Sequence, residues 1–203
     1  MLESCVLRYR HGRIAATQRV KAVSCPFLAE IGQVNRIYRM VALISINIRD
    51  ATIADISRLA EIWHGAWHDA HDRIVPPELV LLRTRESFDS GLRAASTSVR
   101  VAGEVDAPLG FYALKGAELY QLFVSTSARG TGVAAALIAD AETRLGQSGV
   151  HTAWLTCAIG NNRAARFYEK SGWTRAGIVI EHVEVAGGTF ALNVWRYEKC
   201  LTR

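Results

Sequence analysis

Cysteine is sparse in this 203-residue sequence, and none of its cysteines lies close to another. Disulfide frameworks and zinc sites need closely spaced cysteines, such as a Cys-x-x-Cys pair, and that pattern is missing. We therefore expect neither kind of site. Reduced thiols are typical of the cytoplasm, which is the location that we predict. The four cysteines are Cys5, Cys25, Cys157 and Cys200.

Long hydrophobic runs are missing as well. No stretch approaches the ~18–20 apolar residues that a membrane-spanning helix needs, so no membrane association is expected. Two glycine-rich nucleotide motifs are also missing. Gly130 and Gly132 are followed by Val133, Ala134 and Ala135, which does not complete Gly-x-Gly-x-x-Gly, and no P-loop sequence occurs.

Most of the chain carries no net charge. The formal charge of +5 comes from residues 1–39, where seven basic residues outnumber Glu3 and Glu30, and the remainder is balanced. A nucleic-acid-binding domain carries its basic patch on folded structure. The sequence therefore predicts no nucleic-acid partner.

Residues 1–39 have weak periodicity and no clear helix caps. They are predicted to be a basic N-terminal extension of a domain that spans residues 40–203. An interaction tail, a targeting presequence and a natural start at Met40 are alternatives for this segment. A secretory signal is not expected, because no apolar core follows the first positive charges. A chain that begins at Met40 is expected to be as stable and active as the full one.

Hydrophobic periodicity predicts strands and helices over the rest of the chain. Thr52 and Asp55 have the spacing of a capping box, which opens the first helix, and a proline pair at 76–77 opens the next helical stretch. Gly187 and Gly188 predict a terminal hairpin. The order β-α-α-β-β-β-α-β-α-β-β indicates an α/β domain with a mixed sheet. The strands are predicted over 41–49, 97–105, 108–115, 118–124, 152–158, 178–185 and 190–199, and the later helices over 133–145 and 162–171.

A glycine-bearing turn from Arg129 to Ala134 joins a predicted strand to a predicted helix. A helix N-terminus leaves its first four N–H groups unpaired and carries about half a positive charge. Gly130 and Gly132 let those groups approach a phosphate, and Arg129 can add a charge-assisted contact. The turn indicates a phosphate site, although close packing alone would also explain its glycines.

A second motif, Asn-Asn-Arg-Ala-Ala-Arg-Phe-Tyr-Glu-Lys-Ser-Gly-Trp, covers residues 161–173. Asn161 is a good N-cap for the helix that follows. Phe167 is predicted to face the core, so Tyr168 points about 100° away around the helix. The Tyr168 hydroxyl can then reach a cleft between this helix and the preceding strand. A packed amphipathic tyrosine is the alternative.

Together the two motifs resemble the GNAT superfamily of acyl-CoA N-acyltransferases. The turn RGTGVA matches the family's Q/R-x-x-G-x-G/A signature, residues 161–173 match its N-x-x-A-x-x-F-Y-E-K-x-G-F/W segment, and ELYQLFV matches its bulged fourth strand. The resemblance is strong over residues 108–200 and follows only the order of elements over 42–107. It implies a GNAT-like, mostly antiparallel and splayed sheet flanked by helices.

The resemblance also implies acetyl-CoA as the donor and an amine as the acceptor. In such enzymes the strand before the turn pairs with the pantetheine arm, the turn holds the pyrophosphate, and exposed N–H groups at the bulge stabilise the oxyanion. The residue matching Tyr168 can protonate the leaving thiolate. The coenzyme-binding residues implied in this way are Leu122, Phe123, Val124, Arg129, Gly130, Thr131, Gly132, Val133, Ala134, Asn161, Arg163 and Tyr168.

The acceptor side follows from the same resemblance. Glu118 is the predicted general base, because many family members place a carboxylate at the start of this strand. An exposed strand-end glutamate is the alternative. Trp63, Trp67 and His71 are predicted to line the acceptor pocket, with Trp63 as a plain core residue as the alternative.

The leading hypothesis is therefore an acetyl-CoA-dependent N-acetyltransferase that acts on a small molecule, peptide or protein. Cys157 is predicted to be buried and a poor nucleophile, so direct transfer is expected. His64 and His68 have a spacing that can bind zinc, but the family chemistry needs no metal and none is predicted. A non-catalytic CoA-binding module is the alternative. The terminal hairpin offers an edge for a possible homodimer.

Overall fold

A computed structural model describes residues 46–95, 98–105, 107–185 and 187–201. The predicted extension over residues 1–39, and residues 41–45 of the first predicted strand, lie outside this part of the chain. Within the described residues, no helix is both long and apolar enough to cross a membrane.

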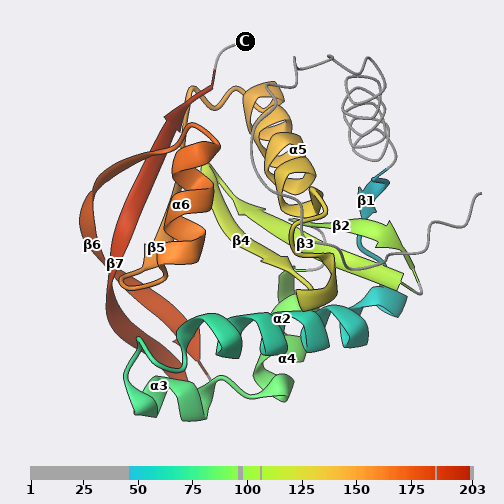
Figure 1. Ribbon diagram of the computed structural model, residues 1–203. Helices are drawn as coiled ribbons and strands as arrows, with labels where there is room; N and C mark the ends of the chain where they lie inside the picture. The colour runs from blue at the N-terminus through green and yellow to red at the C-terminus, as the bar shows by residue number, and fades with distance from the viewer. Residues whose placement is uncertain (1–45, 96–97, 106, 186, 202–203) are drawn as a thin grey trace, which may run out of the picture. The chain divides into compact units, whose positions relative to one another are not determined.

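The described strands form one seven-stranded sheet in the order β1-β2-β3-β4-β5-β7-β6 (Figure 1). Neighbouring strands are antiparallel except β4 and β5, which are parallel. β7 lies between β5 and β6, because the second strand of the predicted terminal hairpin pairs with β5. The predicted mixed, mostly antiparallel sheet is confirmed. The strands are β1 Ile48–Asp50, β2 Val99–Glu104, β3 Ala107–Lys115, β4 Glu118–Val124, β5 Thr152–Ala158, β6 Thr174–Val185 and β7 Gly188–Cys200.

Helices cover both faces of the sheet (Figure 1). Side chains of a strand alternate between its two faces. On β3, Phe111 and Ala113 therefore pack in the cluster formed with α2, α3 and α4, whereas Tyr112 packs in the cluster formed with α5 and α6. The core thus consists of two apolar layers with the sheet between them. The helices are α2 Ile56–His71, α3 Pro77–Leu82, α4 Arg85–Ala95, α5 Val133–Gln147 and α6 Asn162–Lys170.

The predicted capping box starts the first helix. The backbone N–H and the hydroxyl of Thr52 both donate to Oδ2 of Asp55 at 2.8 Å. A short 3₁₀ turn, η1 (Ile53–Asp55), then leads into α2. Asp55 is fully buried and pairs with Arg49 of β1 at 2.6 Å. This carboxylate therefore ties the start of the helix to the edge of the sheet.

Three predicted elements need correction. β6 begins at Thr174, four residues before the strand predicted over 178–185. β1 begins at Ile48, so Ile46 and Asn47 lie before the strand that was predicted to include them. The helical stretch predicted from residue 76 is broken into α3 and α4 at Arg83, whose φ of −92° and ψ of 64° are not helical. Thr84 accounts for the break, because its hydroxyl accepts a bond from the Ser87 N–H and starts a new helix.

β4 and β5 diverge soon after they begin, which confirms the predicted splay. Among the described residues these strands pair only at Glu118 and Trp154. Beyond that point β4 pairs with β3 alone, so the backbone edge of residues 119–124 that faces β5 has no strand partner. The open edge leaves N–H and C=O groups available to a ligand.

The predicted bulge lies at Tyr120. Gln121 pairs with Ala113 and Leu119 pairs with Leu114, so Tyr120 has no opposite residue on β3. A bulge of this kind bends the strand and redirects its side chains and backbone groups. It lies within the open part of β4, which has no partner on the β5 side.

Candidate active site

The turn between β4 and α5 presents unpaired N–H groups. α5 begins after Gly132, whose φ of 95° is left-handed, and its first helical bond runs from the Ala136 N–H to the Gly132 carbonyl. The N–H groups that precede Ala136 on this helix have no helical acceptor. Gly130 is also left-handed, at φ 75°, so glycine suits both positions because of its backbone conformation. This geometry fits the predicted phosphate site.

A cavity of about 490 Å³ runs from this turn along the open edge of β4 to α6. Two predicted coenzyme residues do not line it. Val133 is buried in the core, and the Thr131 hydroxyl donates to the Ala128 carbonyl at 2.7 Å, so these two side chains shape the turn. The predicted residues that do line the cavity are Leu122, Phe123, Val124, Arg129, Gly130, Gly132, Ala134, Asn161, Arg163 and Tyr168.

Two of these residues share one carboxylate oxygen. Arg129 and Arg163 lie 2.9 and 2.8 Å from Oδ2 of Asp69, which is near the end of α2. The Arg163 bond is the main cause that lowers the pKa of Asp69, and Arg129 adds to it. Asp69 was not predicted as a site residue. Its carboxylate pairs with both of the guanidinium groups expected to meet the coenzyme phosphates.

Asn161 confirms its predicted capping role. Its Oδ1 accepts the Ala164 N–H at 3.2 Å and so starts α6. The same residue lines the larger cavity, which leaves its amide nitrogen as the group able to contact the coenzyme.

Tyr168 lines the larger cavity from α6. Burial is the main cause that raises the pKa of its phenol above the ordinary value, and Cys157 and Tyr197 raise it further. The hydroxyl is therefore protonated at neutral pH and can act only as a donor of its proton. Phe167, predicted to face the core, lines the cavity as well and packs partly against the core.

Cys157 is buried as predicted, although it also lines the larger cavity. Burial raises the pKa of its thiol to about 12. The nucleophilic form of cysteine is the thiolate, which is scarce at neutral pH when the pKa is this high. Cys157 is accordingly a poor candidate for a covalent intermediate.

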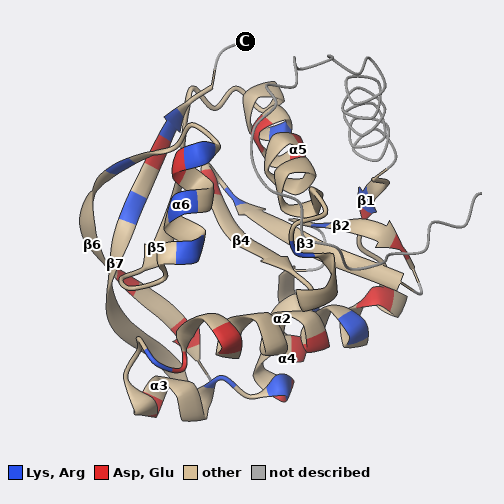
Figure 2. Cartoon of the chain, in the orientation of Figure 1, with Lys and Arg blue, Asp and Glu red and all other residues tan. Residues whose placement is uncertain are grey.

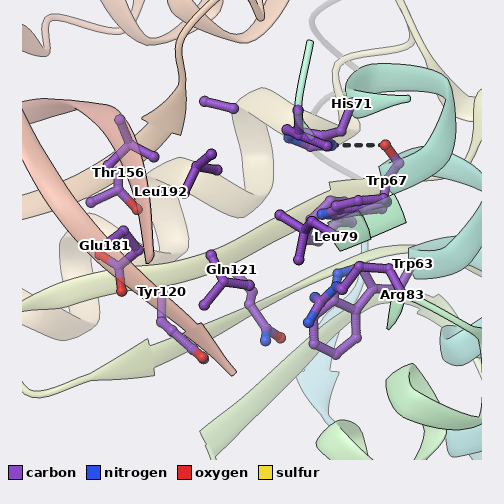
Figure 3. Close-up of a pocket in the computed structure, with 15 residues that line it drawn as sticks. Trp63, Trp67, His71, Leu79, Arg83, Tyr120, Gln121, Thr156, Glu181 and Leu192 are labelled. Carbon is purple, nitrogen blue, oxygen red and sulfur yellow. Dashed lines mark hydrogen bonds between the residues drawn. The ribbon is translucent and has the colours of Figure 1, made fainter. Parts of the chain in front are cut away.

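A second cavity, of about 140 Å³, is bounded by α2, α3 and the β6–β7 hairpin (Figure 3). Trp63, Trp67 and His71 all line it, so the three predicted acceptor-side residues lie together. Trp63 is also part of the core, because its ring centroid is 4.7 Å from that of Phe88. The two cavities meet along β4 and β5 through shared residues, which are His71, Tyr120, Gln121, Phe123, Thr156 and Ala158.

Glu118 is only 5% exposed, so the alternative of an exposed strand-end glutamate is wrong. Burial raises the pKa of its carboxyl to about 7, Glu181 raises it further, and Lys115 and Arg196 oppose the shift. A group with this pKa can exchange protons at neutral pH. Glu118 lines neither cavity, however, and so is not part of the wall of the site.

Within the part of the chain that the structure describes, no group of three His, Cys, Asp or Glu side chains could hold a metal ion. The rings of His64 and His68 are 4.4 Å apart. Both ring nitrogens of His68 are engaged: Nδ1 lies 2.7 Å from Asp72 Oδ1, and Nε2 lies 2.8 Å from the Arg83 carbonyl.

Sequence reasoning missed five polar residues of the smaller cavity: Arg83, Tyr120, Gln121, Thr156 and Glu181. Arg83 had a local signal, since Thr84 is a possible N-cap and indicates a helix break just after it. Glu181 is on β6, and only the tertiary fold brings it to the same cavity as residues of β4. Its place in the cavity has no local signal.

A splayed sheet, an open helix N-terminus beyond its central strand and a tyrosine on the facing helix define the acetyltransferase class of α/β proteins. The model described as the Acetyltransferase (GNAT) family matches residues 56–173, which is more than half of the chain. The chain belongs to this family. No curated protein matches it.

Solved structures of acetyltransferases share the fold. A GCN5-related N-acetyltransferase from Rhodopseudomonas palustris has a TM-score of 0.60 at 22% identity, over 77% of this chain and 96% of that one. PaiA N-acetyltransferase from Thermoplasma acidophilum, in complex with coenzyme A, has a TM-score of 0.54 at 19% identity, over 77% of this chain and 99% of that one. YncA from Salmonella typhimurium, a putative acetyltransferase with its cofactor acetyl-CoA, has a TM-score of 0.54 at 18% identity, over 78% and 95%.

Proposed function

We propose that this chain is an acetyl-CoA-dependent N-acetyltransferase that transfers an acetyl group directly to an amine. The observation that carries the proposal is the meeting of two cavities at the open edge of β4. The larger cavity starts at an anion-binding turn, and the smaller one lies under α2. A donor in the first and an acceptor in the second would meet at Tyr120 and Gln121, which belong to both walls.

The residues of the larger cavity fit the coenzyme. The N–H groups at the start of α5 suit a pyrophosphate, and the unpaired edge of β4 suits the amide-bearing pantetheine arm. The two neighbours named above as complexes with coenzyme A and acetyl-CoA support this donor. The donor supplies a thioester, whose carbon–sulfur bond breaks as the acceptor nitrogen bonds to the acetyl carbon and loses a proton.

In this proposal Tyr168 donates its phenolic proton to the departing sulfur. The raised pKa keeps this phenol protonated at neutral pH, so its proton is available to the thiolate as the carbon–sulfur bond breaks. Backbone N–H groups at the bulge around Tyr120 stabilise the negative charge that develops on the acetyl oxygen.

Glu118 takes the proton from the acceptor amine. A pKa of about 7 makes it half ionised at neutral pH, which suits a general base. Because Glu118 lines neither cavity, the proton must reach it through water. Glu181, which lines the smaller cavity and is electrostatically coupled to Glu118, marks the side from which that water would approach.

Incubation with acetyl-CoA and a panel of amines tests the proposal, with free thiol followed over time. The panel contains amino acids, polyamines, aminoglycosides and peptides, and a second donor set with longer acyl chains defines the donor. We expect thiol release that depends on one class of amine. Coenzyme binding without release on any amine would instead support the non-catalytic module.

The other predicted properties stay predictions. The cytoplasmic location and the lack of a nucleic-acid partner rest on sequence composition alone. The possible homodimer has a suitable edge, because β6 is the outer strand of the sheet and carries Ile178 and Ile180 with 63% and 64% of their surface exposed. Sedimentation of the purified chain would show whether two copies associate.

A further inference from the structure

The smaller cavity contains buried polar atoms that have no hydrogen-bond partner among the described residues. They are Nε1 of Trp63, Nε of Arg83 and Oε1 of Gln121, and all three residues line this one cavity (Figure 3). A buried polar atom without a partner costs about 1–3 kcal/mol, so native proteins rarely retain such atoms without a function. Three at one cavity indicate a ligand that supplies the missing partners.

Arg83 is also a buried charge without a counter-ion. It is 9% exposed, and no salt bridge to it is present among the described residues. Its Nη1 donates to the Glu184 backbone carbonyl at 2.7 Å, while the Glu184 carboxylate is exposed and lies 3.7 Å from Lys115. Burial lowers the pKa of Arg83 to about 10, which still leaves a cation at neutral pH.

Aromatic rings surround this cation. The guanidinium carbon lies 4.5 Å from the ring centroid of Phe88 and 5.5 Å from those of Trp63 and Trp67. Such contacts offset only part of the cost of burying a charge. The guanidinium therefore remains a strong site for an anion.

The fold holds Arg83 in place from outside the cavity. The break between α3 and α4 turns its backbone out of the helix, and His68 contacts its carbonyl oxygen at 2.8 Å. Asp72 in turn contacts the other ring nitrogen of His68 at 2.7 Å. The cation is thus fixed in position before any ligand arrives, which reduces the entropy cost of binding.

We propose that the acceptor is a small amine that carries a carboxylate, and that Arg83 and Trp63 bind this carboxylate. The inference rests on the proposed acetyl transfer. Two N–H donors at one end of the cavity match the two oxygens of a carboxylate. Gln121 offers its free Oε1 to the amine where the two cavities meet, and Glu181 lies across the cavity from Arg83 (Figure 3).

The size of the cavity supports a small acceptor. A volume of about 140 Å³ accommodates an amino acid and is too small for a folded protein segment or an aminoglycoside. An amino acid carries an ammonium group and a carboxylate on one small molecule, and the cavity is lined by a cation, Arg83, and a carboxylate, Glu181. The acceptor class that fits is a free amino acid or a close analogue.

Paired substrates test the inference. For each amino acid in the panel, kcat/KM is compared with that of its carboxamide, which keeps the amine and the shape but removes the negative charge. We expect the wild-type chain to prefer the carboxylate by about 100-fold or more, because an unpaired buried charge penalises the amide. Equal kcat/KM values for an amino acid and its carboxamide would overturn the inference and leave the proposed acetyl transfer intact.

Arg83→Met should abolish this preference, because it lowers kcat/KM for the carboxylate and removes the unpaired buried charge that penalises the amide. Arg83→Lys, which keeps the charge but not the fork of donors, should retain part of it. Arg85→Met is the matched control, since Arg85 is nearly half exposed and pairs with Glu61. If Arg83→Met still prefers the carboxylate substrate over the amide, another residue binds the substrate carboxylate and the inference is wrong.

Two further measurements keep the outcomes distinct. Coenzyme A affinity of the Arg83 variants reports whether the larger cavity is still folded. Binding of an N-acetyl amino acid in the presence of coenzyme A, followed by calorimetry, tests the anion site without turnover, so it stays decisive if no amine is acetylated. Tighter binding of an aminoalkyl phosphonate than of the matching carboxylate would overturn the choice of carboxylate.

Discussion

Arg129 and Asp69 form an ion pair of 2.9 Å that joins the turn between β4 and α5 to the end of α2. Figure 2 shows basic residues along α6 and acidic residues on α2. Because Arg163 contacts the same Asp69 oxygen, this carboxylate takes the position of an anion between two guanidinium groups. A coenzyme phosphate would have to compete with it.

Asp69→Asn should therefore tighten coenzyme A binding. The pairs are partly exposed, with about half of the Asp69 side chain accessible, so the gain should be near the ~0.2–1 kcal/mol of surface pairs, or a few-fold in Kd. Calorimetry at low and high salt checks this, because screening should shrink the gain. Asp89→Asn removes the same charge from an exposed pair on α4 and serves as the control. Weaker binding in Asp69→Asn would show that Asp69 positions the arginines instead.

Tyr168→Phe should lower kcat by about 100-fold or more, with little change in coenzyme A affinity, because it removes the donated proton and keeps the ring. Steady-state kinetics and a direct binding measurement separate the two quantities. Tyr112→Phe is the control: its hydroxyl donates to Asp140 at 2.6 Å and lines neither cavity. That variant should lose about 1 kcal/mol of stability and keep its rate. An unchanged rate in Tyr168→Phe would remove Tyr168 from the chemistry.

Glu118 should make both activity and stability depend on pH. As a base with a pKa of about 7, it predicts that kcat/KM rises with pH through 7, and Glu118→Gln should lower and flatten that rise. A pH-independent wild-type rate between 6 and 8 would contradict the role.

The stability effect has the opposite sign. Folding raises this carboxyl pKa from 4.5 to about 7, so the stabilisation due to the protonated form is complete below pH 4.5 and is lost as pH rises through 7. Glu118→Gln resembles the protonated form and should gain stability over wild type at pH 8, on the order of 3 kcal/mol at most. Urea unfolding at pH 5 and pH 8 measures the difference, with the exposed Glu78→Gln as control.

Gly110→Ala should destabilise the fold and weaken coenzyme binding together. A Cβ at Gly110 would lie 2.6 Å from the Phe123 carbonyl oxygen and 3.0 Å from Val124 Cα, so β3 and the open strand β4 would have to move apart. Overpacking of this kind costs about 1–3 kcal/mol. Gly65→Ala, in an exposed position of α2 with nothing within 4 Å, should instead gain about 0.5–1 kcal/mol. Denaturant unfolding of both variants checks the contrast.

Local pattern was enough to predict the part of the chain that holds the donor. β4 and β5 have the predicted bounds, and α5 begins at Val133 as expected. These elements have strong hydrophobic periodicity, the next helix α6 has a clear cap in Asn161, and the motif at the turn lies on adjacent residues. The candidate chemical groups of that region can therefore be predicted from short sequence segments.

The acceptor side could not be predicted to the same depth. Arg83 looked like one more residue of an amphipathic helix, and only the tertiary fold shows that it is buried among aromatic rings. Glu118 was expected at a strand end, which is usually exposed, but its burial follows from strands that come later in the chain. Residues brought together from β4, β6 and α2 share no local signal in the sequence.

The divergence of β4 from β5 has a consequence for the lifetime of the protein. An unpaired strand edge in the middle of a sheet sacrifices backbone hydrogen bonds that folding would otherwise gain. A bound donor restores them and adds about 2.7 kcal/mol of stability when its concentration is 100 times its Kd. This stabilisation should lower the population of the opened state about 100-fold and slow its degradation equally. The abundance of this protein in a cell would then follow the supply of its acyl donor.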